Sequence, residues 1–313
     1  MKRVLIITLL AIGMLFCLCG CGINSYAYLY SDKYSAGSGD VPASEVNSLD
    51  IDWAAGSVDI VYTDGNTVEF TETCAKPLDE SEQMHWYVNN GCLMIKYKAA
   101  KVGISFDLSL AMTPSKSLTV SLPRGLELDG LNIDVASTSV KGDDLMAKKA
   151  SIDTASGSVA LSFTSVEDIK LDTASGEVNV AAKCDINSIE VDTASGKVDV
   201  SVMNGSSLVT DTASGEVNIS AGSFDLVNID TSSGAVRTEF RAAPKKCRVD
   251  TASGKVVIAL PDDAEFTADV DTASGDFTCE FPTTQSGGVY TCGSGSSSFS
   301  IDTASGDVSI VKM

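Results

Sequence analysis

A repeated pentapeptide constrains the fold of this 313-residue chain more than any other feature. Asp-Thr-Ala-Ser-Gly occurs seven times and Asp-Thr-Ser-Ser-Gly once, in steps of 19 to 21 residues except for a final step of 31. Degenerate relatives begin at Asp52 and Asp134. Recurrence at such a period is the signature of a repeat architecture. The copies begin at Asp153, Asp172, Asp192, Asp211, Asp230, Asp250, Asp271 and Asp302, and end at Gly157, Gly176, Gly196, Gly215, Gly234, Gly254, Gly275 and Gly306.

Apolar residues alternate with polar ones on both sides of each pentapeptide. Before the copy at Asp172, Ile169 and Leu171 stand two apart, and Val178 and Val180 do so after it. A period of two is typical of β-strands with one buried face. Each repeat is therefore predicted to be a strand, a tight turn and a second strand.

Two short strands cannot bury such a face alone, whereas units stacked in register can. We predict an all-β fold, a β-solenoid (β-helix or β-roll) of about 19–20 residues per coil with an irregular N-terminal β cap. A propeller would need some 40–50 residues per blade, and the leucine framework of leucine-rich repeats is absent. At about 4.8 Å per coil, nine coils would form a rod roughly 45 Å long.

The pentapeptide chemistry suggests a role for each residue. We expect Asp to accept backbone N–H groups in an Asx-turn, Ala to permit close approach, and Gly to adopt positive φ. Thr and Ser would pair with their copies in adjacent coils. Stacked carboxylates would repel by roughly 0.9 kcal/mol in water and roughly 3.5 kcal/mol at an effective dielectric of 20. Backbone donors are the favoured means of offsetting this repulsion, and bridging calcium is the alternative.

The chain divides into four predicted segments: a signal peptide at 1–21, a flexible tether at 22–40, an N-terminal β region and cap at 41–130, and the repeats at 131–313. Five strands are expected in the third segment, with a hairpin turn at Asn89-Asn90-Gly91. The insertion before Asp302 is predicted to be a loop. The terminal strand, Val308 to Met313, has little beyond it to act as a cap, which would favour end-to-end assembly.

The first 21 residues have the layout of a secretory signal. Lys2 and Arg3 precede an apolar run that ends in Leu18-Cys19-Gly20-Cys21. This ending resembles the bacterial lipobox, which implies cleavage before Cys21 and attachment of diacylglycerol to it. Cys19 is a poorer fit because Leu18 would precede the cut, and an uncleaved helical anchor is the other alternative. The protein is expected at the extracytoplasmic face of the cell membrane, to which the lipid would anchor it.

Six cysteines remain after the signal peptide: Cys74, Cys92, Cys184, Cys247, Cys279 and Cys292. An even number outside the cell permits disulfides, and Cys74–Cys92 and Cys279–Cys292 are candidate pairs. Because none of the six lies in a C-x-x-C pair, a zinc site or a thioredoxin-like centre is not expected. We predict no metal and no cofactor.

Composition and motifs argue against catalysis and nucleic-acid binding. The net charge is −20, and removal of residues 1–21 takes away two basic residues and no acid, leaving −22. Such a surface repels phosphate backbones. His85 is the only histidine. The acidic group of Asp262, Asp263 and Glu265 is read as an exposed turn and His85 as a packed strand residue, so we predict no catalytic residues and no enzyme.

Several motifs resemble those of a bacterial putative-adhesin family of β-strand-repeat envelope proteins of unknown function. They are Leu122-Pro123, the strand into Asp134-Val-Ala-Ser, and the repeated Ser-Gly-x-Val pattern, and the resemblance covers about residues 45–313. It implies an extracytoplasmic β-repeat protein without agreed catalytic residues. Some relatives sit beside envelope-stress signalling systems, which permits a sensory role.

The leading functional hypothesis is an adhesin or envelope-binding module. A repetitive face suits cell-wall glycan or another envelope protein. A self-assembling scaffold and an envelope-stress signalling accessory are the alternatives. A polysaccharide-active β-helix enzyme is disfavoured because the carboxylates recur once per coil instead of forming a local pair.

Overall fold

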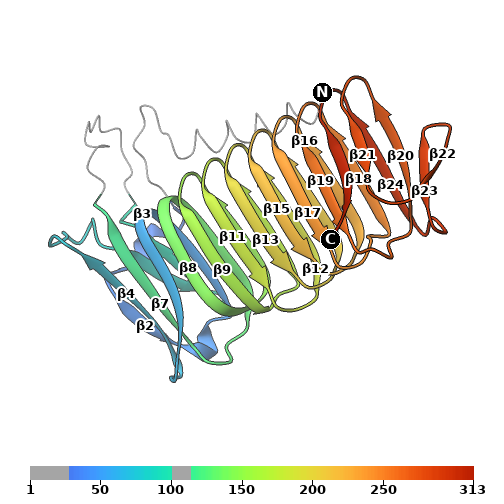
Figure 1. The fold of residues 1–313 in the computed structure, drawn as a ribbon. Helices are drawn as coiled ribbons and strands as arrows, with labels where there is room; N and C mark the ends of the chain where they lie inside the picture. Colours follow the sequence, from blue (N-terminus) through green and yellow to red (C-terminus); the bar gives the residue numbers. More distant parts are fainter. Residues whose placement is uncertain (1–27, 101–113) are drawn as a thin grey trace. The chain divides into compact units, whose positions relative to one another are not determined.

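The computed structural model describes residues 28–100 and 114–313, and those residues fold almost entirely into β-strands (Figure 1). The predicted signal peptide, Cys21 and the first part of the predicted tether lie outside the described residues. No helix within the two described ranges is long and apolar enough to cross a membrane. The chain forms two compact units, residues 1–159 and 160–313.

Unit 1 is built around one long strand, β3 (Ser48–Thr63), with parallel neighbours on both edges. On one edge it pairs with β8 (Leu128–Thr154); on the other it pairs with β6 (Cys92–Lys96) and then β7 (Lys116–Pro123). The register sets Asp52 beside Asp134, so the two degenerate pentapeptides stack on each other. Coil stacking therefore begins well before the first complete copy of the motif.

Antiparallel strands cap unit 1. β4 (Thr67–Cys74) pairs with β7 and with β2 (Gly39–Pro42), while β5 (His85–Asn89) pairs with β6 and with β1 (Ser35–Ala36). Asn90 and Gly91 both have positive φ between β5 and β6, which confirms the hairpin turn. Residues 31–40, predicted as tether, instead include η1 (Ser31–Lys33), β1 and the start of β2, followed by η2 (Ala43–Glu45).

Unit 2 consists of coils that each contribute one strand before and one strand after the pentapeptide, and β9 (Ser158–Ser165) spans the boundary between the units. All neighbouring coils are parallel and in register, as the pairing of Asp172 with Asp192 and of Asp192 with Asp211 illustrates. The predicted all-β solenoid is therefore confirmed. The leading strands are β10 (Asp168–Thr173), β12 (Ile186–Thr193), β14 (Gly205–Thr212), β16 (Phe224–Thr231), β18 (Lys246–Thr251), β20 (Phe266–Thr272) and β24 (Ser297–Thr303). The trailing strands are β11 (Glu177–Ala182), β13 (Lys197–Val202), β15 (Glu216–Ala221), β17 (Ala235–Phe240), β19 (Val256–Leu260), β21 (Phe277–Cys279) and β25 (Val308–Lys312).

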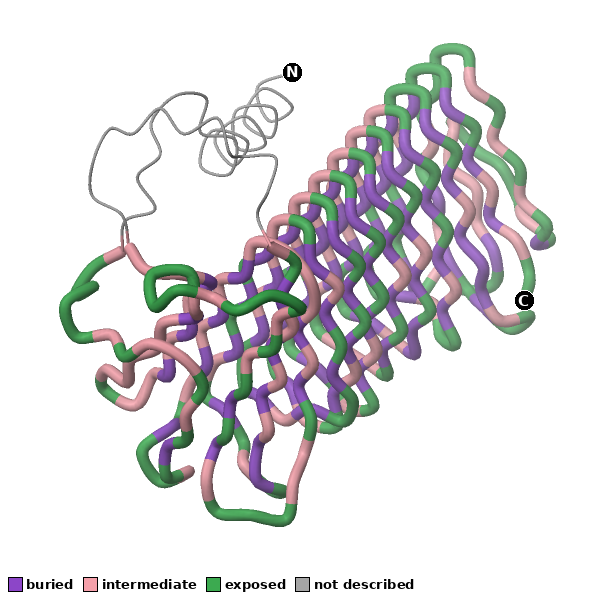
Figure 2. The backbone as a smooth tube through the Cα atoms, turned by 90° about the vertical axis from the view of Figure 1, so that its left-hand side faces the viewer, coloured by how far each residue is buried: buried purple, intermediate pink, exposed green. Residues whose placement is uncertain are grey.

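The core of unit 2 is made of columns of like residues. Register sets Ile189 beside Leu208 and Val191 beside Thr210, all of them buried. Figure 2 shows the resulting alternation of buried and outward positions along the strands. Thr210 replaces the usual aliphatic residue, and its buried hydroxyl has no hydrogen-bond partner.

The pentapeptide corners are hydrogen-bonded from coil to coil. Ala194 N–H donates to the carbonyl of Thr173, and Ser195 N–H donates to that of Ala174, at 3.0 and 2.9 Å. The Ser195 hydroxyl donates to the Ala174 carbonyl as well, and six other copies repeat this contact at 3.1–3.2 Å. The backbone hydrogen bonding between coils thus continues from the strands through each corner.

The turn itself is closed by threonine, not aspartate. In five copies the Thr hydroxyl accepts the Gly N–H three residues on, at 2.9–3.1 Å. These Thr side chains are buried, whereas the Asp side chains point outward and are partly exposed. The predicted Asx-turn is therefore wrong, because the inward Thr, not the outward Asp, faces the glycine amide.

The repeat glycines allow the backbones of adjacent coils to approach closely, and they do not adopt positive φ. None of the eight repeat glycines is among the residues with positive φ. A Cβ added at Gly215 would overlap the carbonyl oxygen of Gly196, and the same overlap recurs between Gly234 and Gly215. The sequence-based reason for the glycine was wrong, although its place at the corner was right.

The C-terminal coil lies inside the stack of unit 2. β24 pairs with β18 on one edge and β20 on the other, and β25 likewise lies between β19 and β21. The predicted loop before Asp302 contains a hairpin of β22 (Thr284–Ser286) and β23 (Val289–Cys292), which pairs with β20. The terminal strand is therefore not the open edge that the sequence suggested.

Replacing one corner glycine tests the close approach. Gly215→Ala should cost about 2 kcal/mol or more of unfolding free energy, because the new methyl group must displace backbone. Urea unfolding followed by circular dichroism measures this loss. Gly65→Ala is the matched control, since its nearest heavy atom would be 3.9 Å away. Equal midpoints for the two variants would contradict the packing described above.

Candidate functional site

The aspartates of unit 2 form a ladder of stacked carboxyl groups. Register runs through Asp172, Asp192, Asp211, Asp230 and Asp250, then Asp302 and finally Asp271. Strand spacing sets neighbouring positions about 4.8 Å apart. The corresponding glycines stack in the same order, with Gly306 between Gly254 and Gly275.

Burial and nearby carboxylates raise the pKa values of three aspartates of this ladder, Asp172, Asp192 and Asp211. Burial raises the pKa of Asp211 to about 7, and Asp192 and Asp230 add to the shift. Burial, together with Asp172 and Glu190, raises the pKa of Asp192 to about 6. No backbone N–H donates to either carboxyl group in the described structure, so the expected backbone donors do not offset the repulsion here, and burial and repulsion favour the protonated forms.

In unit 1, a lysine lies beside the stacked aspartates and reduces their mutual repulsion. Register sets Lys96 beside Asp52, and Asp52 beside Asp134. Lys96 Nζ lies 3.0 Å from Asp50 and 3.9 Å from Asp52. The pKa of Asp134 is nevertheless raised, first by burial and then by Asp52. Raised carboxyl pKa values thus occur at Asp134 in unit 1 and at Asp192 and Asp211 in unit 2.

The described residues hold no group of three or more His, Cys, Asp or Glu side chains arranged to bind a metal ion. The ladder places one aspartate carboxyl group per coil, so its own members do not form a local cluster. Asp153 lies in unit 1, and the seven other predicted ladder aspartates lie in unit 2.

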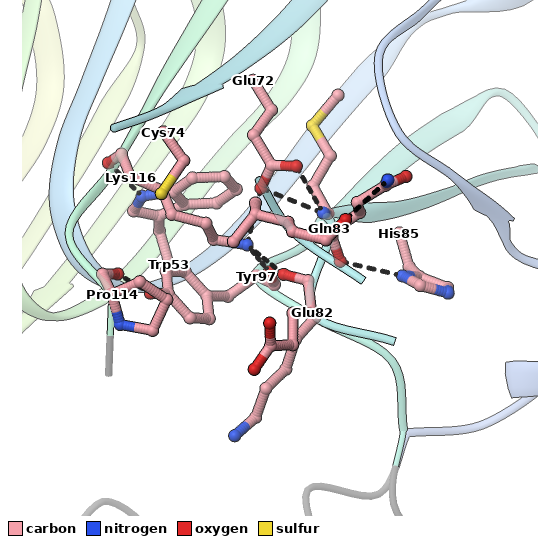
Figure 3. Close-up of polar contacts among 12 residues, drawn as sticks. Trp53, Glu72, Cys74, Glu82, Gln83, His85, Tyr97, Pro114 and Lys116 are labelled. Atoms are coloured by element: carbon pink, nitrogen blue, oxygen red, sulfur yellow. Dashed lines mark hydrogen bonds and ion pairs between the residues drawn. The ribbon is translucent and has the colours of Figure 1, made fainter. Parts of the chain in front are cut away.

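A buried ion pair in unit 1 joins β4 to β7 (Figure 3). Lys116 Nζ lies 2.6 Å from Glu72 Oε1, with side chains 0% and 6% exposed. Lys116 also donates to the carbonyls of Glu82 and Tyr97, and Glu72 accepts the Met84 N–H. Burial lowers the pKa of Lys116, and Glu72 opposes that shift. Since the ammonium group is fully enclosed, the pair has a structural role.

The other titratable candidates are engaged in local contacts. His85 Nδ1 lies 3.0 Å from the Gln83 carbonyl, to which it donates, on strand β5 of unit 1. In unit 2, Asp262 pairs with Lys312 at 3.4 Å, and Glu265 accepts a serine hydroxyl. These contacts agree with the structural interpretation of both features.

The cysteines are unpaired in the described structure: Cys74, Cys92, Cys184, Cys247, Cys279 and Cys292 are all free. The proposed Cys74–Cys92 and Cys279–Cys292 disulfides are therefore absent. The Cys74 thiol is directed to the Ser115 carbonyl, and the Cys292 thiol to the Ala264 carbonyl, so neither thiol faces its proposed partner.

The candidate binding site is a hollow of about 320 Å³ on the outer surface of β11, β13, β15 and β17. Register there aligns outward side chains in two rows across the strands. One row is Asn179, Asp199, Asn218 and Arg237; the other includes Ser201, Ser220 and Glu239. We call these seven residues the polar face. Val200 and Ile219 complete the lining.

Hydrogen bonds organise the polar face. Asn218 Nδ2 donates to Asp199 Oδ1 at 2.9 Å, and Lys197 Nζ donates to Asp199 Oδ2 at 2.8 Å. Burial opposes ionisation of Asp199, but these bonds outweigh it and hold its pKa below the ordinary value. Arg237 pairs with Glu239 at 3.0 Å on the same strand while both stay about half exposed. Amide, hydroxyl, carboxylate and guanidinium groups are thus presented together to solvent.

Sequence analysis missed the polar face because no motif marks it. The only signal was one outward position of the trailing strands, the third residue of each. It is polar or charged in four successive coils, as Asn179, Asp199, Asn218 and Arg237. The pentapeptide residues predicted as a ladder form the corners beside this surface, not the hollow itself.

Comparison with known proteins gives a family and several similar structures. The Toastrack DUF4097 family profile matches residues 46–311. Similar crystal structures include a putative cell adhesion protein from Clostridium sporogenes, at 12% identity over 90% of this chain and 100% of the other, with a TM-score of 0.24. Putative adhesins from Parabacteroides distasonis and Bacteroides fragilis match at 14% and 9% identity over 88% of this chain and 97% of each other chain, with TM-scores of 0.45 and 0.41. No curated protein gives a significant match.

The ladder should make unit 2 more stable in mild acid. Asp192 and Asp211 have raised pKa values in the folded protein, so the folded state binds protons before the unfolded state does as pH falls. The melting temperature should therefore rise from about pH 8 to about pH 5.5, and gain nothing more from these two groups below about pH 4. Differential scanning calorimetry measures it.

Asp211→Asn should raise the melting temperature at about pH 8 and flatten the rise. Asp262→Asn, at a carboxylate outside the ladder with 77% of its side chain exposed, is the control. A wild-type melting temperature that falls over this range, or an unchanged slope in Asp211→Asn, would contradict the ladder's electrostatics.

Proposed function

The chain belongs to the Toastrack DUF4097 family, and from this premise we propose that it is a non-catalytic module that binds envelope glycan through its polar face. A lipid on Cys21 holds the module at the extracytoplasmic face of the cell membrane. The observation that carries the binding role is the outward hollow, in which two register-aligned rows of polar side chains meet.

The side chains of the polar face suit a ligand rich in hydroxyl groups. Asn179, Asn218, Ser201 and Ser220 offer both donors and acceptors, as a sugar does. Ser201 and Ser220 lie on adjacent strands, and Asn179 and Asn218 lie two strands apart in one row. A polymer can therefore meet similar contacts on successive strands.

Charge narrows the ligand class. Lys197 pairs with Asp199 and Arg237 pairs with Glu239, so both acids of the polar face have a cationic partner. Glu177 and Glu216 flank Lys197 in register, so this surface keeps only a small negative charge on a protein of net charge −20. A neutral glycan meets this surface without repulsion, whereas a polyanion would experience the field of the whole chain.

The absence of catalysis is supported by how the reactive groups are used. Lys116 is enclosed with its donors occupied, and His85 donates to a backbone carbonyl in the cap. The ladder carboxyl groups recur once per coil, which is a structural arrangement and not the local carboxylate pair of a glycosidase.

The lipid anchor rests on the leader, where a basic start and an apolar run end in Leu18-Cys19-Gly20-Cys21. The self-assembly alternative rested on an open terminal strand. β25 is paired on both edges, so the end of the stack is instead the coil of β20 and β21, where the β22–β23 hairpin covers β20.

Co-sedimentation with purified cell walls tests the glycan proposal. The mature protein in detergent should pellet with walls in a dose-dependent way and remain in solution without them. The double variant Asn218→Ala/Arg237→Ala should weaken binding about tenfold or more, because two hydrogen-bonding groups leave the polar face.

Asn228→Ala/Arg248→Ala is the matched control. Those residues are also adjacent Asn and Arg on neighbouring strands, but they lie on leading strands β16 and β18. A wild-type protein that stays in the supernatant would reject wall glycan and favour a protein partner or a signalling role. Pelleting without walls would favour self-assembly, and equal loss in both double variants would show that the polar face is not the binding site.

A further inference from the structure

An aromatic surface lies where the described chain begins. The Tyr28 and Tyr34 ring centroids are 4.6 Å apart, and those of Tyr34 and Tyr87 are 5.5 Å apart. Lys33 Nζ lies 4.9 Å from the ring centroid of Tyr30 and 5.8 Å from that of Tyr87. We call this group the tyrosine surface: Tyr28, Leu29, Tyr30, Lys33, Tyr34 and Tyr87.

Apolar exposure is concentrated here. Leu29 is 81% exposed and Tyr30 is 54% exposed. The other exposed large apolar residues among those described are isolated in sequence, at Val61, Met203, Leu226 and Met313. Single exposed apolar residues are normal on a protein surface, whereas a contiguous patch marks an interaction site.

The tyrosine surface is held in place by the cap. The Tyr28 hydroxyl donates to the Lys98 carbonyl at 3.2 Å and accepts the Ala100 N–H at 3.1 Å. The Tyr34 hydroxyl contacts the Met94 sulfur on β6 at 3.4 Å. Leu29 and Tyr30 therefore project from a fixed base.

We propose that the tyrosine surface lies against the headgroup region of the phospholipid bilayer. This inference rests on the lipid anchor in the proposed function. Only six residues lie between Cys21 and Tyr28, and the seven Cα–Cα steps that join the two span at most about 25 Å. The anchor thus keeps the tyrosine surface at high effective concentration beside the bilayer.

The chemistry of the tyrosine surface fits that location. Tyrosine rings prefer the membrane interface because they combine an apolar body with a polar tip, and Leu29 can enter the acyl boundary. The exposed Asp32 and Lys33 cancel in charge, so residues 28–34 add no repulsion of their own toward anionic lipids.

Fluorescence quenching in vesicles tests the docking. Tyr30→Trp is placed in the full lipidated protein and reconstituted into phosphatidylethanolamine–phosphatidylglycerol vesicles with brominated acyl chains. The wild-type protein already contains Trp53 and Trp86, so its emission is subtracted. The remaining emission, from the added tryptophan, should be weaker in brominated vesicles than in vesicles without bromine. Leu226→Trp, at a site 43% exposed on β16, is the matched control and should keep its added emission.

The outcomes separate the docking from its premise. Lipidated protein in which the tryptophan added at Tyr30 is not quenched, or is quenched no more than the one added at Leu226, overturns the docking alone. Mature protein whose mass shows no diacylglycerol on Cys21 overturns the anchor and, with it, the docking. The glycan-binding test of the polar face is unaffected by either result.

Discussion

The structure depends on hydrogen bonds that pass from corner to corner between adjacent coils. Because Ala and Ser amides donate to carbonyls of the preceding corner, as Ser195 does to Ala174, two corners can stack only if their backbones have the same shape. The pentapeptide secures that shape. A buried threonine closes the turn, and a glycine lets the carbonyl of the adjacent coil approach more closely than a Cβ would allow. Every flanking strand then starts in phase.

Stacking the coils in register has one favourable and one unfavourable consequence. It aligns inward aliphatic residues into columns and outward polar residues into the rows of the polar face. It also stacks like carboxyl groups, and the ladder responds with raised pKa values at Asp192 and Asp211. The outward side chains are less constrained than the corners, since they need only tolerate their vertical neighbours. Variation from coil to coil at those positions is what allows one part of the stack to become a binding surface.

Local patterns in the sequence predicted the fold because its period and alternation are local properties. The same patterns placed the corner glycines correctly but assigned them and the aspartates the wrong roles. The alternation of Ile169 and Leu171 continues through the corner, where it turns Thr173 inward and Asp172 outward, and the Asx-turn hypothesis did not follow it that far. The position of the C-terminal coil between β18 and β20 was not predictable from the repeat, because β24 skips the preceding coil to pair Asp302 with Asp250 and also pairs with Asp271. The polar face and the tyrosine surface were missed for a related reason: each is assembled from residues that only register or ring packing brings together.

Amide hydrogen exchange at the corners is the most direct test of this account. The amides of Ala194, Ser195, Ala213 and Ser214 donate to the neighbouring coil, so they should be protected as strongly as amides in the adjoining strands. Ordinary solvent-exposed turns exchange rapidly. If these four amides exchange as fast as those of the exposed residues Asp262 and Asp263, the corners are not hydrogen-bonded between coils and the account is wrong.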